Sequence, residues 1–334
     1  MDTATNPTPT WRPENCDRLA LVLQGGGALG AYQAGVYEAL HHAGLEPDWV
    51  TGVSIGAINA AIIAGNPRER RLERLREFWE TLTARQIWPF APDGDAPRRA
   101  RNGWSAMVTM LSGQPGFFDV NLPGPLFSPR GAKQATSYYD SAPLRKALLD
   151  LVDFDLINAR RTRFACGAVN VASGNFAYFD NASVEIVPEH VMASGALPPA
   201  LPMVPLGTDY FWDGGLVSNT PLQHLLDCIG AENVLVFQVD LFSARGTIPR
   251  DMPEVLSRQK DIQYSSRTRL TTDLDGRMHK MKPQLRNLLD ASMREHWAIG
   301  RTDTGRSLRH KDWLRMPKAD QGIITHDIHR PDAD

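Results

Sequence analysis

The sequence predicts a three-layer α/β/α fold with a mainly parallel central sheet. Short apolar runs that favour strands alternate with segments of helical spacing from residue 19 to residue 241. The runs LALVLQ (19–24) and NVLVFQVDL (233–241) are apolar almost throughout, as strands covered on both faces are. The chain of 334 residues is 42% hydrophobic with a net charge of -2, so it can bury a substantial core.

The positions of the helices and strands are predicted from the spacing of apolar residues and from residues typical of helix ends. Gly44 predicts the end of the first helix, Ser141 is a plausible N-cap, and Asn219 or Thr220 caps a helix that has Pro221 at its start. The expected strands lie at 19–24, 48–54, 163–171, 175–181, 209–216 and 233–241. The expected helices lie at 28–44, 55–65, 67–82, 141–152, the beginning of 188–206, and 219–230.

The regular pattern is interrupted at residues 85–140, which are rich in proline, glycine and aromatic residues. This stretch is either an elaborated surface excursion or a lid or apolar rim of a pocket. Residues 1–16 read as a flexible tail, and from residue 243 the composition shifts to charged helical segments. We therefore expect one main domain over 17–242 and a mainly helical extension over 243–334 that packs on it.

Composition excludes several classes of protein. The near-neutral charge gives no basic footprint for nucleic acid. Cys16, Cys166 and Cys228 are too few and too scattered for a disulfide framework or a thiolate zinc site, so we expect no metal and a reducing compartment. No apolar run approaches the about 20 residues that span a bilayer, and the start lacks signal-peptide features. These features predict a cytoplasmic protein, with peripheral contact with a membrane or lipid surface left open.

A nucleophilic serine is indicated by the motif Gly52-Val53-Ser54-Ile55-Gly56, which is G-x-S-x-G. It lies where an expected strand ends and a helix of small residues begins, the context that this motif requires. A serine on such a corner projects clear of the sheet, and the N-terminal amides of the helix point at the reacting centre. The alternative is an ordinary turn lined by glycines.

The base that such a serine needs is best supplied by Asp213. None of the nine histidines lies in a context typical of a triad histidine. Asp213 follows the expected strand DYFW and precedes Gly214 and Gly215, so it lies at a strand end where α/β proteins build sites. Taken alone, Asp-Gly could equally mark a turn.

The loop QGGGALGAYQAG (24–35) admits two interpretations. Gly25, Gly27 and Gly30 have the G-x-G-x-x-G spacing of a dinucleotide-binding loop. A nucleotide-binding oxidoreductase would place an acidic residue at the end of the second strand, but Ser54 occupies that position. The other interpretation is a set of backbone donors, Gly25, Gly26 and Gly27, for an oxyanion, with Gly30 permitting close helix packing.

In combination and in this order, the glycine loop, the Ser54 motif and Asp213-Gly-Gly resemble the patatin-like phospholipase family, as does ASGALPPALPMV at 193–204. The resemblance covers roughly residues 18–242, so that 17–242 would be a patatin-like catalytic domain. The segment SMREHWAIGRTD (292–303) resembles an extension of one bacterial subgroup. One departure is Leu29, where many members carry Arg or Lys.

The resemblance implies a serine acyl hydrolase of the phospholipase A or lipid esterase type, with no cofactor. By that resemblance Ser54 is the nucleophile, Asp213 is the general base of a Ser-Asp dyad, and Gly25, Gly26 and Gly27 form the oxyanion hole. The implied partner is a lipid or other ester substrate, through an acyl-enzyme intermediate. A non-catalytic lipid-binding protein with a hydrolase-like scaffold is a further alternative. Oligomeric state and the identity of the ester are left open.

Overall fold

A mixed seven-stranded sheet forms the centre of the described part of the chain. The computed structural model describes residues 11–83, 114–230, 232–278 and 293–314. Four neighbouring strands run parallel in the order β9-β1-β2-β5. Their bounds are β1 Arg18–Leu23, β2 Trp49–Val53, β5 Arg163–Asn170 and β9 Val234–Val239.

Three further strands extend the sheet in the antiparallel sense. β6 (Phe176–Asp180) and β8 (Asp209–Asp213) both pair with β5, and β7 (Val204–Leu206) pairs with β8. Because β6 occupies one edge of β5 along residues 165–169, β8 must pair with the edge that β2 uses. β2 and β8 therefore approach each other end to end along the same side of β5.

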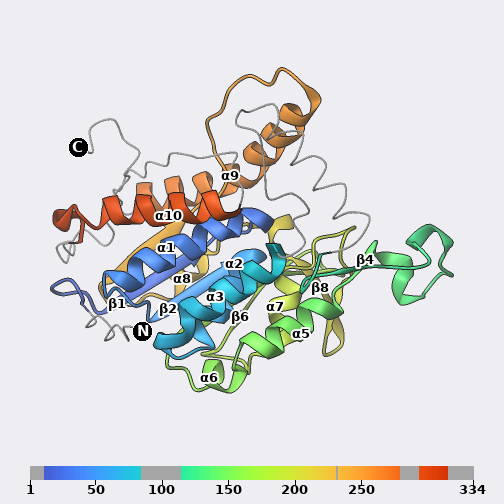
Figure 1. Cartoon of the computed structure of the whole chain (residues 1–334), viewed down its shortest axis with the longest axis horizontal. Helices are drawn as coiled ribbons and strands as arrows, with labels where there is room; N and C mark the ends of the chain where they lie inside the picture. Colours follow the sequence, from blue (N-terminus) through green and yellow to red (C-terminus); the bar gives the residue numbers. More distant parts are fainter. Residues whose placement is uncertain (1–10, 84–113, 231, 279–292, 315–334) are drawn as a thin grey trace, which may run out of the picture.

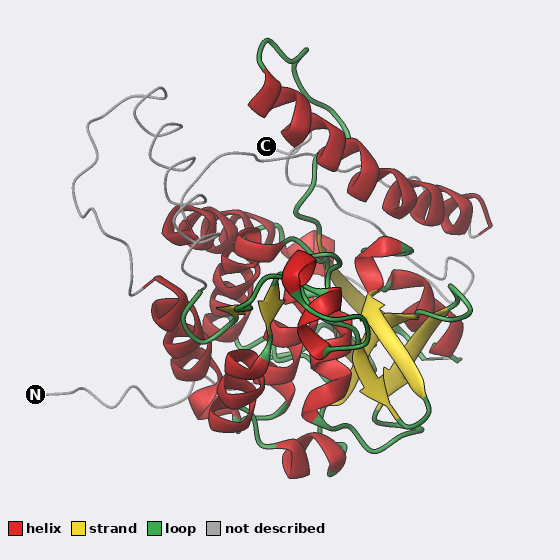
Figure 2. Cartoon of the chain, turned by 90° about the vertical axis from the view of Figure 1, so that its right-hand side faces the viewer, coloured by secondary structure: helices red, strands yellow, loops and turns green. Residues whose placement is uncertain are grey.

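Alternate residues of β1 face two helical layers, which makes the fold three-layered. Leu19, Leu21 and Leu23 pack into the core that contains α1 (Ala31–His42) and α2 (Ile55–Ala64). The intervening Ala20 and Val22 pack against Leu222 and Leu225 of α8 (Leu222–Cys228) on the other face. Figure 2 shows the sheet between these helices. The predicted fold class is confirmed.

The first core is extended by four more helices: α3 Arg68–Thr83, α5 Ala142–Leu151, α6 Phe154–Asn158 and α7 Pro188–Ser194. Buried apolar residues of all four contribute to it, among them Phe78, Leu148, Ile157 and Val191. The exposed face of α3 carries charge pairs such as Arg74–Glu77, as its alternating sequence predicts.

Three sequence signals at helix ends have mixed outcomes. Gly44 has φ 75 just beyond α1, which confirms it as the stop signal because this backbone conformation favours glycine. Ser141 occupies the N-cap position of α5, but its side chain makes no capping hydrogen bond. The prediction of Asn219 or Thr220 as the cap of α8 is wrong, since the helix begins at Leu222 with Pro221 at its N-cap. Asn219 is engaged elsewhere, as described below.

The irregular region is described only from residue 114 onward, and residues 84–113 lie outside the described residues. The described part forms a two-stranded excursion. Its strands are β3 (Asp119–Val120) and β4 (Tyr139–Asp140), which pair antiparallel. Between them lie two short 3-10 helices, η2 (Pro125–Phe127) and η3 (Lys133–Thr136). The excursion projects from the molecule in green in Figure 1.

The C-terminal residues form two helices, α9 (Met252–Met278) and α10 (Met293–Ser307). α10 lies along α1 (Figure 1). A hydrogen bond of 3.2 Å joins Tyr32 to Asp303, and Arg301 pairs with Glu38 at 3.4 Å. The boundaries at 16/17 and 242/243 stay predictions, and residues 1–10 and 315–334 lie outside the described part. No described helix is both long and apolar enough to span a bilayer.

The contact between α10 and α1 depends on Gly300. A Cβ atom at Gly300 would lie 2.2 Å from the Tyr32 carbonyl oxygen, whereas one at Gly305, on the same helix, would meet nothing within 4 Å. We expect Gly300→Ala to lower the free energy of unfolding by about 1–3 kcal/mol through overpacking. Gly305→Ala should raise it by about 0.5–1 kcal/mol through helix propensity. Urea unfolding of both variants tests this, and equal midpoints would show that α10 does not depend on this contact.

Candidate active site

Ser54 lies between the last residue of β2 and the first residue of α2. Its φ of 56 and ψ of -126 are unusual for a residue with a side chain, and such backbone strain of about 1–3 kcal/mol is typical of functional sites. The turn is held from outside: the Ser54 amide donates to both the Oγ (3.0 Å) and the carbonyl oxygen (3.1 Å) of Ser194. The Ser194 hydroxyl in turn donates to the Gly167 carbonyl at 2.7 Å.

The two glycines of the serine motif permit this sharp corner. A Cβ atom at Gly52 would lie 2.2 Å from the carbonyl carbon of Gly56. A Cβ atom at Gly56 would lie 2.3 Å from the Leu23 carbonyl oxygen, at the end of β1. Because both contacts are with backbone atoms, which cannot move aside cheaply, the two positions require glycine. The strand-to-helix corner predicted from the sequence is confirmed.

Asp213 reaches Ser54 because two strands converge on β5. Val53 pairs with Gly167, and Asp213 pairs with the next residue, Ala168. The end of β2 and the end of β8 therefore meet beside two consecutive residues of β5. The Ser54 side chain lies near enough to the Asp213 carboxyl to lower its pKa. The two residues that the sequence singled out are thus brought to the same place in the fold.

The environment of Asp213 favours its neutral form. The residue is 2% exposed, and this burial raises the pKa of its carboxyl to about 6. The hydrogen bond from the Gly215 amide at 2.7 Å and the nearby Ser54 side chain act in the opposite direction and lower the pKa by stabilising the charge. Gly214 lets the chain turn here, since a Cβ atom on it would lie 2.5 Å from the Gly167 carbonyl oxygen.

The glycine loop packs directly on Ser54. A Cβ atom at Gly25 would lie 3.0 Å from that of Ser54 and 2.3 Å from the Asn219 side-chain oxygen. Asn219 clamps Gly25 at two points: it accepts from the Gly25 amide at 3.1 Å and donates through Nδ2 to the Gly25 carbonyl at 2.8 Å. The Gly25 amide is therefore already hydrogen-bonded within the fold. Of the three amides predicted as donors to an oxyanion, those of Gly26 and Gly27 remain.

Gly26 and Gly27 lie at the start of η1 (Gly27–Gly30), directly before α1. The first amides of a helix have no partner within the helix, so this is a position for donors to a bound anion. Gly27 has φ 57, a conformation that favours glycine. Gly30 closes the turn: a Cβ atom there would lie 2.6 Å from the Ile55 side chain, in agreement with the packing role predicted for it.

A chain of buried polar side chains fixes the loop relative to α1, α2 and α3. The Gln33 side chain donates to the Gln24 carbonyl at 2.6 Å, Asn59 donates to Gln33 at 2.9 Å, and Trp79 donates to Asn59 at 3.1 Å. Asn59 also donates to the Gly30 carbonyl at 3.0 Å. Every member has a partner, so the chain provides rigidity without unpaired buried groups.

Sequence reasoning missed several of these residues. Ser194 falls within the segment 193–204 that was singled out, but nothing marked its hydroxyl as a support for Ser54. Asn219 carried a signal that pointed to a helix cap. The chain of Gln33 and Asn59 carried none, since an isolated polar residue in a helix is usually read as exposed.

The described histidines serve other functions. His41 pairs with Glu46 at 2.6 Å, His224 pairs with Asp180 at 2.9 Å, and His190 accepts from the Val187 amide at 3.0 Å. Among the side chains that the structure describes, no histidine is hydrogen-bonded to Ser54 or Asp213.

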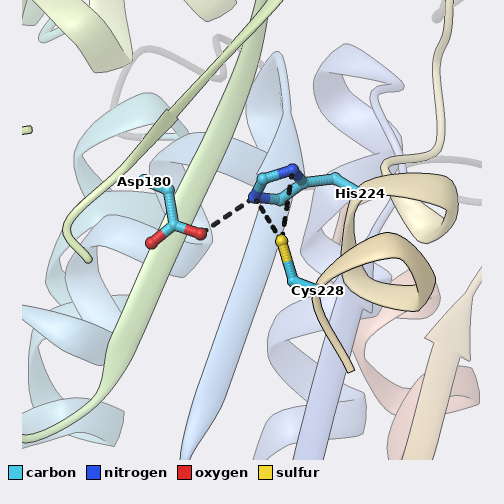
Figure 3. A group of neighbouring side chains, drawn as sticks. All are labelled: Asp180, His224 and Cys228. Atoms are coloured by element: carbon cyan, nitrogen blue, oxygen red, sulfur yellow. Dashed lines mark hydrogen bonds and ion pairs between the residues drawn. The ribbon is translucent and has the colours of Figure 1, made fainter. Parts of the chain in front are cut away.

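A second polar cluster lies at the opposite end of the strands from Ser54. Asp180, at the end of β6, contacts His224 of α8, and the Cys228 sulfur lies 4.0 Å from both ring nitrogens (Figure 3). These three residues have donor atoms within 4.8 Å of one another, the spacing of a potential metal site. The cluster adjoins Trp49, the first residue of β2, whereas Ser54 follows the last, so about 17 Å of strand separates the two sites.

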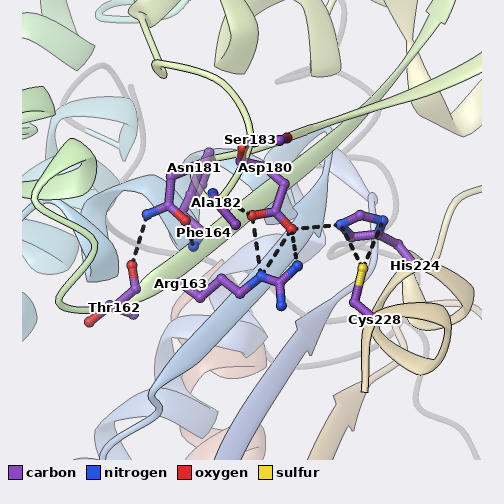
Figure 4. A network of polar contacts seen from close by, with 9 residues as sticks. All are labelled: Thr162, Arg163, Phe164, Asp180, Asn181, Ala182, Ser183, His224 and Cys228. Atoms are coloured by element: carbon purple, nitrogen blue, oxygen red, sulfur yellow. Dashed lines mark hydrogen bonds and ion pairs between the residues drawn. The ribbon is translucent and has the colours of Figure 1, made fainter. Parts of the chain in front are cut away.

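Arg163 gives this cluster a structural explanation. Its guanidinium donates to both oxygens of Asp180, at 2.7–3.2 Å (Figure 4). It also lies 3.8 Å from the centre of the Trp49 ring. The Ala182 amide also donates to Asp180, at 2.8 Å. The carboxylate is thus already neutralised and hydrogen-bonded, and a dication would have to displace Arg163. We assign the cluster to stability.

The fold and the site together define a three-layer α/β protein with a serine-aspartate pair beneath a glycine loop. A family model described as patatin-like phospholipase matches residues 21–226, which is more than half of the chain. The chain belongs to the patatin-like phospholipase family. The matched range contains the glycine loop, Ser54 and Asp213. This membership does not favour the nucleotide-binding alternative.

Relatives share parts of the sequence. Lysophospholipase nte1 of Aspergillus terreus is 26% identical over 244 residues, which cover 72% of this chain and 13% of that protein. Human patatin-like phospholipase domain-containing protein 6 is 42% identical over 67 residues, 20% of this chain and 5% of that protein. Triacylglycerol lipase ptl3 of Schizosaccharomyces pombe is 42% identical over 59 residues, 18% of this chain and 12% of that protein. The chain thus spans 13% or less of the length of each.

Solved structures with a similar arrangement include VipD from Legionella pneumophila. It is 15% identical, with a TM-score of 0.45, and the match covers 97% of this chain and 76% of VipD. ExoU, in its complex with SpcU from Pseudomonas aeruginosa, is also 15% identical, with a TM-score of 0.38 over 92% of this chain and 53% of that chain.

The Asp180 cluster predicts an acid-sensitive contribution to stability. Its contacts with His224 and Arg163 outweigh the effect of burial and lower the pKa of Asp180 to about 2. A carboxyl with a lowered pKa stabilises the fold above its unfolded pKa of about 3.9, and this contribution is lost as the pH falls toward 2. Asp180→Asn should therefore reduce the free energy of unfolding by about 2 kcal/mol at pH 7, and the difference from the parent should shrink below pH 4 and nearly vanish at about pH 2.

Urea unfolding between pH 2 and 7 measures this difference. The control is Asp150→Asn, because Asp150 forms an exposed pair with Lys146 and should contribute less than about 0.5 kcal/mol. Zinc or EDTA should leave the free energy of unfolding of the parent protein unchanged, since Arg163 already pairs with the Asp180 carboxylate. Stabilisation by zinc that is lost in Asp180→Asn would identify the cluster as a metal site instead.

Proposed function

We propose that this protein is a serine acyl hydrolase that cleaves carboxyl esters of lipids through a Ser54–Asp213 dyad. The observation that carries the proposal is the convergence of the strained Ser54 and the buried Asp213 carboxyl beside β5, where burial raises the pKa of Asp213 to about 6. A base with this pKa can accept a proton near neutral pH, whereas an ordinary aspartate, near 3.9, accepts one poorly. Membership of the patatin-like phospholipase family supports the choice of lipid substrates.

In the first half-reaction Ser54 Oγ attacks the ester carbonyl carbon while Asp213 takes the hydroxyl proton. The carbonyl π electrons move to the oxygen, which becomes an oxyanion. We assign the amides of Gly26 and Gly27 as its donors, with the N-terminus of α2 adding positive potential. The intermediate then expels the alkoxide, Asp213 returns the proton to it, and an acyl group remains on Ser54.

In the second half-reaction water attacks the acyl-serine carbonyl and transfers a proton to Asp213. The second tetrahedral intermediate collapses by breaking the bond to Ser54 Oγ. Asp213 returns its proton to that oxygen, which releases a carboxylic acid and restores the hydroxyl. Gly25 and Asn219 support both steps by holding the loop against Ser54, and Ser194 does so by holding the Ser54 amide.

Two variants separate the roles of the dyad. We expect Ser54→Ala and Asp213→Asn each to lower kcat/KM for a p-nitrophenyl ester by at least 1,000-fold, because one removes the nucleophile and the other its base. The control is Ser173→Ala, which changes an exposed serine of the β5–β6 turn and should keep wild-type activity. A fluorophosphonate probe should label Ser54. Equal rates in the parent and both dyad variants would exclude the dyad.

The pH profile should report the protonation state of Asp213. Only the ionised carboxylate can act as the base, so kcat/KM should be constant above the pKa of about 6 and fall tenfold per pH unit below it. The measurement is ester hydrolysis between pH 4.5 and 8, in buffers where circular dichroism shows the protein to be folded. A profile that is flat down to pH 4.5 would show that Asp213 is not the base.

A further inference from the structure

The excursion between β3 and β4 ends in an exposed apolar tip. We call residues 121–138 the finger. Leu122, Leu126 and Phe127 in its tip are 83%, 86% and 83% exposed. Soluble proteins do expose single apolar residues, but three large ones this exposed within six positions form a patch that indicates an interaction.

The finger is locally ordered by its own hydrogen bonds. At its base the Asn121 amide donates to the Tyr138 carbonyl at 2.9 Å, and the Asn121 side chain donates to the Ser137 carbonyl at 3.0 Å. Within the tip, Ser128 Oγ donates to the Gly124 carbonyl at 3.2 Å. The apolar side chains are therefore presented outward by a hydrogen-bonded backbone.

The charge of the finger matches an anionic surface. Residues 121–138 contain two cations, Arg130 and Lys133, and no Asp or Glu. Apolar side chains next to cations are the combination that binds the interface of a bilayer, where the former enter the acyl boundary and the latter meet anionic headgroups. A protein partner gives no comparable reason for both features.

The finger is joined to the active-site side of the sheet. The amides of Tyr138 and Tyr139 donate to the carbonyls of Pro199 and Ala200, at 3.2 and 3.0 Å. That segment directly follows α7, whose Ser194 holds the Ser54 amide, and its Ala196 carbonyl accepts from the Asp213 amide at 3.0 Å. In Figure 1 the finger projects beyond α7 and β8. A surface that binds the finger would face the site that contains Ser54.

We propose that the finger is a membrane-docking element: Leu122, Leu126 and Phe127 insert into the interface of an anionic bilayer and bring the active site to esters held in it. The proposal deepens the proposed function and rests on it for the purpose of docking, but the binding itself does not require catalysis. The occupant of the patch is thus a lipid surface containing acidic phospholipids.

The test is flotation with vesicles, in the Ser54→Ala background so that no lipid is hydrolysed. Vesicles of phosphatidylcholine with 30% phosphatidylglycerol (about a third anionic, so that a basic finger is attracted) should bind the parent, and pure phosphatidylcholine should bind it less. Changing Leu122, Leu126 and Phe127 together to Ser should lower the partition coefficient at least tenfold. The control is Trp11→Ser, which changes an exposed aromatic residue beside Gly44, at the far end of α1 from the glycine loop.

A second measurement separates docking from folding and from catalysis. With Ser54 intact, the triple finger variant should hydrolyse a soluble p-nitrophenyl ester at the parent rate but release at least tenfold less fatty acid from the anionic vesicles. Flotation of the triple variant equal to that of the parent, or no flotation of the parent, would overturn the docking proposal. Absence of ester hydrolysis by the wild type, with flotation dependent on the finger, would instead overturn the proposed function alone.

Discussion

The close approach of four backbone segments beside Ser54 is the constraint on which the site depends. The ends of β1, β2 and β8 and the glycine loop all meet there, at distances that leave no room for Cβ atoms at Gly25, Gly52, Gly56 and Gly214. Each of these glycines contacts a different segment, so a larger residue at any one of them would displace a different part of the site. The motif glycines are thus required by packing, apart from any role as donors, which explains why they occur at the junctions between strands and helices.

Burial of Asp213 links reactivity to a cost in stability. A carboxyl whose pKa is raised from about 3.9 to about 6 destabilises the native state when it ionises, by up to about 3 kcal/mol above pH 6. The sign is opposite to that of Asp180, whose partners hold its pKa low and whose charge stabilises the fold. The same sheet thus has a stabilising carboxylate at one end of its strands and a destabilising one at the other. The difference is Arg163, which compensates Asp180, while the donor to Asp213 in the described part of the chain is the uncharged Gly215 amide.

The features that could be predicted from the sequence are those that depend on residues close together in the chain. Apolar runs located the segments that form the parallel strands, and helical spacing located the helices between them. The corner at Ser54 followed from five consecutive residues. Asn219 could not be predicted in the same way, because the residue it clamps, Gly25, is 194 positions away and its local context resembles a helix cap. β7 escaped notice because it is three residues long and contains Pro205, which is unfavourable within a sheet but tolerated where its missing amide is not needed. The burial of Asp213 likewise follows only from the pairing of β8 with β5.

The buried Asp213 and the exposed apolar finger would both suit the proposed lipid-ester substrate. Burial that raises the pKa of Asp213 also limits access of water, and a soluble substrate would have to be desolvated on entry. A lipid ester already lies in an apolar phase, so its acyl chains lose little hydration when they move from the bilayer into the protein. The cost that remains is to bring the enzyme to that phase, and interfacial side chains near the site reduce it. In the proposed function, the buried base and the finger would both lower the cost of desolvating the substrate. Burial would keep the Asp213 carboxylate away from water, and the finger would bring the site to a bilayer, where the ester is already out of water.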